Sequence, residues 1–331
     1  MKKFLLKSIS LLCIISMIFI SLISCQNNSS DETETVSNVH TVKFNSNGGT
    51  EIKDVEVRHG QKIAEPDAPT RENYIFLYWE QNNRKWHFGV QEVKEDITLS
   101  ALWISANDLF KIEPCENENE ILIAGFLNQK SISILSIPEK INGKTVVGFT
   151  DNAFEAIHEL HARKIIIPST VRSIGKESFM NIAQVHLEFE GPVSVLNVSS
   201  FEECRTLEIL KFNPGITSIP YRCFFECEKL ITSDIPEGVT LIEENAYASC
   251  KALQTVVLPS TLATIEDSAF LDCSTLVAVF FRGTEEQFNE VEIMKNNDKL
   301  LNANIYFYSE TKPENEGNFW HYDKSNTPIL W

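Results

Sequence analysis

Positive charge is scarce in this sequence. It holds 29 lysine and arginine residues against 46 aspartates and glutamates, so the formal net charge is −17 over 331 residues. A nucleic-acid backbone is held by clustered Lys and Arg side chains, so this balance argues against nucleic acid as a partner. The excess of negative charge also keeps an exported protein soluble, which is the simplest interpretation of it.

Motifs for catalysis, metal binding and cofactor binding are also lacking. The sequence has no glycine-rich phosphate loop. His158 and His161 are three residues apart, whereas zinc proteases place two histidines four apart on one helical face. The acidic run at 116–120 lacks the glycine and the distal glutamate of a calcium loop. We therefore expect no catalytic residue, no metal and no cofactor, and we interpret the protein as not an enzyme.

The long apolar run at the N-terminus, from Ile9 to Ile23, follows three lysines and has the pattern of an export signal. The next residues, Leu22 to Cys25, resemble the lipobox of bacterial lipoproteins. This resemblance implies removal of residues 1–24 and lipid attachment at Cys25; a retained membrane helix is the alternative. The removed segment carries three basic and no acidic residues, so the mature charge would be 26 − 46 = −20. Lipids alone would then hold the protein on a membrane at the cell surface.

An apolar pattern recurs six times between residues 160 and 283. Its first positions are 22, 23, 23, 23 and 23 residues apart, and an aromatic residue and a cysteine keep the same interval. The first positions are Ile167, Phe189, Phe212, Ile235, Leu258 and Phe281; the aromatics are Phe179, Phe201, Phe224, Tyr247 and Phe270; the cysteines are Cys204, Cys227, Cys250 and Cys273. A repeat this short cannot enclose its own core, so the pattern predicts a solenoid of stacked coils.

The four periodic cysteines are expected to occupy equivalent interior positions as buried thiols that pack like small hydrophobic groups. Adjacent coils lie within disulfide range of one another, so a bond along the column is an open alternative. A bond between Cys223 and Cys227 is another.

The segments 165–179, 234–247 and 257–273 resemble the BspA-like leucine-rich repeats of bacterial surface proteins. Proline, the apolar pair, the aromatic and the cysteine all fall at the expected places. The resemblance implies a mainly β leucine-rich repeat solenoid over residues 121–283. One coil departs from the pattern around Val193, where we expect a bend or bulge.

Residues 40–103 resemble the Listeria-Bacteroides repeat, a small β-grasp-like domain. Alternating strand patterns flank an Asn-Gly-Gly turn at 47–49, and an aromatic strand at 74–79 and a final strand at 97–103 follow. The polar segment 25–39 is expected to be a flexible stalk, and residues 104–120 a solvated linker. Residues 284–331 are expected to form a C-terminal cap and tail, in which five apolar residues cover the open end of the solenoid: Phe288, Ile305, Phe307, Trp320 and Trp331.

Side chains between the inward positions of the repeat strands should point to solvent and align in columns. We call one of these the outer column; it contains Ile166, Glu188, Lys211, Asp234, Val257 and Phe280. Opposite charges in its middle can neutralise each other across strands. An exposed Val257–Phe280 pair could form a docking patch, or it could contact the C-terminal cap.

The family resemblance implies adhesin-like attachment of a monomer to an extracellular or host protein. A carbohydrate- or envelope-binding lipoprotein is the alternative, and it would require exposed aromatics clustered on one face.

Overall fold

The computed structural model describes residues 38–128, 132–155, 162–182, 186–314 and 316–331. Residues from Val39 to Trp331 form one compact unit. The expected export signal, Cys25 and the stalk to residue 37 lie outside the described residues, as does the His158–His161 pair. The fold is mainly β, as the sequence predicts.

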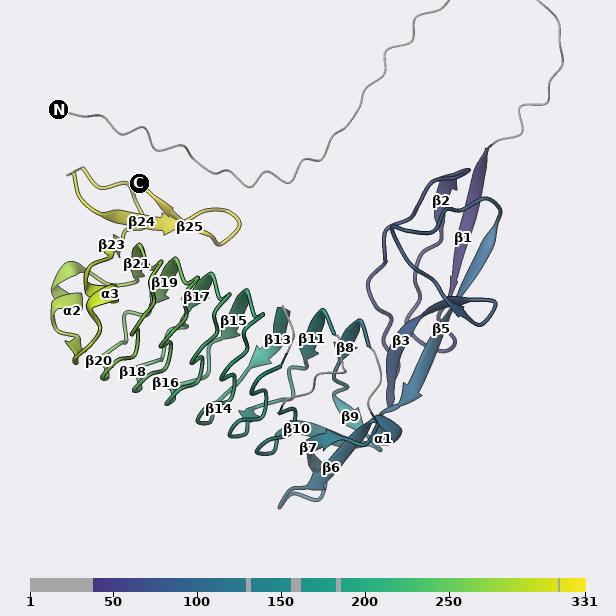
Figure 1. Cartoon of the computed structure of the whole chain (residues 1–331), viewed down its shortest axis with the longest axis horizontal. Helices are drawn as coiled ribbons and strands as arrows, with labels where there is room; N and C mark the ends of the chain where they lie inside the picture. The colour runs from purple at the N-terminus through teal and green to yellow at the C-terminus, as the bar shows by residue number, and fades with distance from the viewer. Residues whose placement is uncertain (1–37, 129–131, 156–161, 183–185, 315) are drawn as a thin grey trace, which may run out of the picture. The chain divides into compact units, whose positions relative to one another are not determined.

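Residues 39–105 form a five-stranded sheet with the order β2-β1-β5-β3-β4 (Figure 1). Strands β1 and β5 run parallel, and the other neighbours are antiparallel. Apolar side chains at alternate positions of these strands make a separate core around Val42, Trp79 and Leu99. The strands are β1 (Val39–Asn45), β2 (Val55–Arg58), β3 (Tyr74–Gln81), β4 (Arg84–Lys85) and β5 (Ile97–Ser105).

Residues 104–120 differ from the expected linker. Ser105 caps helix α1 (Ala106–Leu109), because its side chain accepts a hydrogen bond from the Asn107 backbone N–H. Strand β6 (Phe110–Pro114) follows and pairs antiparallel with β7 (Glu120–Phe126). Phe110 is buried in the solenoid core, so this segment is the first layer of the solenoid.

The solenoid has one long sheet and a broken second side. The long sheet has ten strands in the order β25-β24-β23-β21-β19-β17-β15-β13-β11-β8, parallel from β8 to β24. Figure 1 shows its strands β8 to β21 stacked one coil after another. Its strands are β8 (Ile134–Ser136), β11 (Lys164–Ile167), β13 (His186–Pro192), β15 (Ile209–Asn213), β17 (Thr232–Asp234), β19 (Thr255–Leu258), β21 (Ala278–Phe281), β23 (Asn304–Tyr308), β24 (Phe319–Tyr322) and β25 (Pro328–Leu330).

The second side consists of short strands in two sheets. One continues from β6 and β7 and has a hairpin partner, β9, beside β10; the other has the order β16-β18-β20-β22. These strands are β9 (Lys140–Ile141), β10 (Lys144–Phe149), β12 (Ser173–Ile174), β14 (Val195–Leu196), β16 (Ser218–Ile219), β18 (Leu241–Ile242), β20 (Thr264–Ile265) and β22 (Glu292–Ile293). The pairing of β13 with β15 shifts between Glu188 and Pro192, which confirms the bulge expected in this coil.

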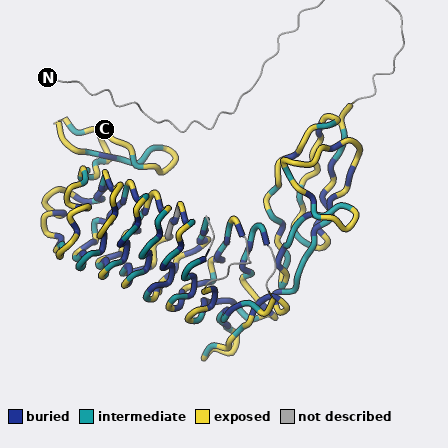
Figure 2. The backbone as a smooth tube through the Cα atoms, viewed as in Figure 1, coloured by how far each residue is buried: buried dark blue, intermediate teal, exposed yellow. Residues whose placement is uncertain are grey.

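The periodic aromatic residues form a stack through the solenoid core. Ring centroids from Phe179 to Phe270 are 5.0 to 5.6 Å apart, and neighbouring planes are tilted by 3 to 26°. These separations match the distance between adjacent strands. Tyr247 fits the phenylalanine column because its hydroxyl is hydrogen-bonded to the Ser233 hydroxyl at 2.9 Å. Figure 2 shows buried positions recurring in each coil.

The cysteine column is buried, as predicted. Each Sγ donates to the carbonyl oxygen of the aromatic residue in the preceding coil, at 3.1 to 3.3 Å, as Cys227 does to Phe201. Cys223 is buried too, and no disulfide joins the cysteines of the described residues. The structure therefore favours the free thiols over either disulfide alternative.

The C-terminal cap uses the predicted residues in different ways. Helices α2 (Glu285–Asn289) and α3 (Asp298–Leu301) cover the last coil, with Phe288 buried and Ile305 and Phe307 packed against the same core. Trp320 is fully buried but packs in a different place, on the face of the ten-stranded sheet. Trp331 is 41% exposed, so its predicted role in closing the coil end is wrong.

Candidate functional site

The outer column has the register expected from the repeat. Ile166 pairs with Glu188, Lys211 lies between Glu188 and Asp234, and the pairing continues through Val257 to Phe280. It extends to Ser136 before Ile166 and to Tyr306 after Phe280. The backbone of Lys211 is placed in β15, but its side chain lies outside what the structure describes. We call the sheet surface that carries this column the outer face.

Charged side chains on β11 and β13 interact with each other on the outer face. The Lys164 ammonium forms an ion pair with the Glu188 carboxylate, and His186 Nε2 lies 3.7 Å from that carboxylate. The hydrogen bond from Lys164 lowers the pKa of Glu188. Partial burial, followed by the charges of Glu188 and Glu139, raises the pKa of Glu190. This end of the face therefore holds one ion pair, Lys164–Glu188, with the Glu190 and Glu139 carboxylates nearby.

The other end of the outer face is covered by the chain itself. Val257 and Phe280 are 4% and 8% exposed, because Trp320 of β24 packs on them. The Trp320 indole N–H donates to the Phe281 carbonyl oxygen at 2.9 Å. The expectation of an exposed Val257–Phe280 docking patch is therefore wrong, and the alternative contact with the cap is present. Phe280 also cannot serve the aromatic cluster that the carbohydrate alternative requires.

Asp234 is held by this C-terminal segment. Its carboxylate forms an ion pair with the Arg282 guanidinium, which also donates to the Ile235 carbonyl oxygen and to the Tyr322 hydroxyl. Arg282 and Tyr322 stand outside the repeat period, so no periodic signal in the sequence marks them. Asp234 thus belongs structurally to the covered end of the outer face.

A cavity of about 780 Å³ lies at the opposite end of the outer face. Residues of the five-stranded sheet line one wall, including Arg71 and Tyr74, and residues of the first coils line the other, including Glu139, Lys140 and Glu190. The Arg71 guanidinium carbon lies 3.9 Å from the centre of the Tyr74 ring. These residues are brought together only by tertiary folding, and sequence reasoning missed the cavity.

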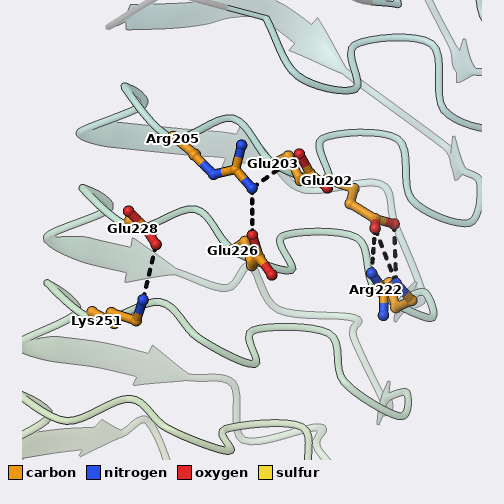
Figure 3. Close-up of polar contacts among 7 residues, drawn as sticks. All are labelled: Glu202, Glu203, Arg205, Arg222, Glu226, Glu228 and Lys251. Carbon is orange, nitrogen blue, oxygen red and sulfur yellow. Dashed lines mark hydrogen bonds and ion pairs between the residues drawn. The ribbon is translucent and has the colours of Figure 1, made fainter.

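The turns of the solenoid carry a second set of ion pairs (Figure 3). Arg205 pairs with Glu203 and Glu226, and Lys251 pairs with Glu228. These side chains are a quarter to a half exposed, so solvent weakens each pair. These side chains have oppositely charged partners within the chain, as Lys164 and Glu188 have on the outer face.

The pair formed by Glu202 and Arg222 is more deeply placed. The Glu202 side chain is 8% exposed, and the Arg222 guanidinium carbon lies 3.6 Å from the centre of the Phe225 ring. The hydrogen bonds that the Arg222 guanidinium donates to the Glu202 carboxylate raise the pKa of Arg222. This arrangement fastens one coil to the next.

The groups that could carry chemistry are poorly suited to it. Burial raises the pKa of the Cys227, Cys250 and Cys273 thiols, the last to about 12, so these sulfurs are protonated and weakly nucleophilic. Within the described ranges, no group of three or more His, Cys, Asp or Glu side chains has a geometry suited to a metal ion. None of the helices placed by the structure is long and apolar enough to cross a membrane.

Comparison with known proteins agrees with both resemblances seen in the sequence. The BspA type leucine-rich repeat region matches residues 147–277 in six copies. The Listeria-Bacteroides repeat domain matches residues 40–102. A protein of Evansella cellulosilytica described as a candidate membrane protein is 42% identical over 69 residues, which cover 20% of this chain and 10% of that protein. The chain thus spans about a tenth of that relative's length.

Solved structures of leucine-rich repeat proteins are also similar. A leucine-rich cell surface protein of Faecalibacterium prausnitzii is 26% identical, with 55% of this chain and 40% of that chain covered and a TM-score of 0.40. A leucine-rich repeat protein of T. pallidum is 21% identical, with 60% and 84% covered and a TM-score of 0.37. Residues 147–277 of this chain are BspA-type leucine-rich repeats, and residues 40–102 are a Listeria-Bacteroides repeat domain.

Proposed function

We propose that this chain is an exported bacterial lipoprotein, anchored through Cys25, whose outer face binds an extracellular or host protein in an adhesin-like role. The observation that carries the proposal is the asymmetry of the outer face. Its β19–β21 end is covered by Trp320, whereas Lys164, Ile166 and Glu188 remain partly exposed on adjacent strands. The BspA-type repeats support a binding role, since such repeats present regular surfaces to proteins.

The chemistry of the open part of the outer face suits a polar protein surface. Lys164, His186 and Glu188 place donors and acceptors on a rigid sheet, so little conformational entropy is lost when a partner binds. Ile166, which is paired with Glu188 on the neighbouring strand, adds an apolar contact. Charge complementarity of this kind sets the partner and the association rate more than it sets affinity.

Binding to immobilised extracellular-matrix proteins tests the outer face. The double variant Lys164→Glu with Glu188→Lys exchanges the members of the ion pair and keeps the net charge. We expect it to weaken binding about tenfold or more, because the charges that face the partner are reversed. The matched control exchanges Glu228 and Lys251, an ion pair on the turns. Equal binding by both double variants and the wild type would show that the outer face is not the site.

Lipid attachment is tested separately in cells that make the full chain. Cys25→Ser removes the proposed acylation site, and we expect the protein to lose labelled fatty acid and to leave the detergent phase in phase partitioning. Retention in the detergent phase without label would favour a membrane helix instead.

A further inference from the structure

The hairpin of β3 and β4 borders a second cavity, of about 360 Å³, that belongs entirely to the Listeria-Bacteroides repeat domain. Asn82 and Asn83 form the two-residue turn of this hairpin, with positive φ values of 52 and 61°. The cavity is lined by Gln81, Asn82, Arg84, Trp86 and Gln91.

The charge of this lining is unlike that of the chain. The protein carries a formal net charge of −17, yet no carboxylate lines the cavity, and Arg84 makes the lining positive. In the described part of the chain, no ion pair or hydrogen bond engages the Arg84 guanidinium. An uncompensated guanidinium beside a cavity can bind a carboxylate through paired hydrogen bonds.

Donors outnumber acceptors in the cavity. The Gln91 side-chain oxygen already accepts from the His87 backbone N–H at 2.6 Å, so its amide nitrogen is the group left to donate. Trp86 is 5% exposed, and its buried indole N–H has no hydrogen-bond partner. Because this N–H is closed to solvent, the donors that face a ligand in the cavity are the Arg84 guanidinium and the side-chain amides.

We infer that this cavity binds an acidic sugar residue of a polysaccharide, such as a uronate. The carboxylate would pair with Arg84, and the hydroxyl groups would meet the side-chain amides, which both donate and accept as hydroxyl groups do. The indole is the one large apolar group of the lining, so the cavity offers little surface to an apolar peptide side chain. The inference is independent of the outer face and of protein binding by the solenoid.

Titration of the exported protein with glucuronate and galacturonate oligosaccharides, followed by Trp86 indole N–H chemical shifts, tests the inference. We expect Arg84→Ala to weaken binding about tenfold or more, since a hydrogen bond to a charged group is lost. Arg58→Ala is the matched control, because Arg58 is exposed and does not line the cavity.

The remaining outcomes each overturn the inference. Equal binding of neutral oligosaccharides would remove the role of the carboxylate. Equal binding of acidic peptides or of acetate would remove the role of the sugar. Unchanged shifts at Trp86 with every oligosaccharide, or equal losses for Arg84→Ala and Arg58→Ala, would show that the cavity is not the site.

Discussion

Replacing Trp320 with alanine should detach the C-terminal hairpin of β24 and β25 while leaving the solenoid folded. Trp320 is fully buried, and its cluster with Val257 and Phe280 is separate from the solenoid core. Beyond this cluster, β24 is paired with β23 at two positions, and the Tyr322 hydroxyl accepts a hydrogen bond from Arg282. Truncation of a buried Trp costs about 3–5 kcal/mol, of which the lost indole hydrogen bond accounts for about 1 kcal/mol. This loss of free energy is comparable with the free energy that keeps a small unit such as the β24–β25 hairpin from opening locally.

Hydrogen exchange measured by mass spectrometry detects the detachment. We expect faster exchange in residues 317–331 and in β19 and β21, with slow exchange preserved in the coils from β11 to β17. Leu330→Ala is the control, because Leu330 belongs to the same hairpin but is 51% exposed; its effect should be below about 1 kcal/mol. Unchanged exchange in 317–331, or loss of protection throughout the solenoid, would refute the separation of the two cores.

Three further predictions concern stability. Cys227→Asp should lower the free energy of unfolding by several kcal/mol in chemical denaturation, because a fully buried position receives an unpaired charge. Cys227→Ala should lower it far less. Similar losses for the two variants would contradict the burial of the cysteine column. Glu202→Gln should lower the free energy of unfolding by about 1–3 kcal/mol, because the partly buried Arg222 loses its counter-charge. Glu228→Gln should lower it by about 0–1 kcal/mol, because the ion pair of Glu228 with Lys251 is exposed. Burial and nearby carboxylates raise the pKa of Glu190. The ionised side chain therefore destabilises the folded protein at a pH above that pKa, whereas the protonated side chain does not. Glu190→Gln should therefore raise the melting temperature near about pH 7 and lose that gain below about pH 4; a gain that persists in acid would contradict the cause.

The repeat period made most of the solenoid predictable. Positions such as Phe201, Cys227 and Tyr247 recur because each coil packs on its two neighbours, so the same side chain meets the same surroundings in every coil. The outer column followed from the same period together with the alternation of strand side chains. The irregular coil around Val193 could also be predicted, because its proline, Pro192, is displaced from the position that proline has in other repeats.

The prediction that residues 104–120 form a solvated linker was wrong for most of this segment. Residues 116–120 are polar and acidic, and this composition outweighed the short apolar signal of Phe110 and Ile112 just before them. In the structure, Phe110 fills the end of the first coil, and β6 pairs with β7. A segment of four or five residues with one buried side chain is too short to show a hydrophobic period, so its strand cannot be assigned from sequence. Packing against neighbouring residues decides whether such a segment forms a strand.

The sequence by itself determined the regular part of this protein: the coil length, the buried aromatic and thiol columns, and the order of residues along the outer face. Only the tertiary structure decided that Trp320 returns to cover Val257 and Phe280, and that Arg84 and Trp86 share a cavity free of carboxylates. The physical reason is the range of the contacts. Contacts between adjacent coils repeat and leave a period in the sequence, whereas a single contact between non-repeating segments occurs once and leaves none.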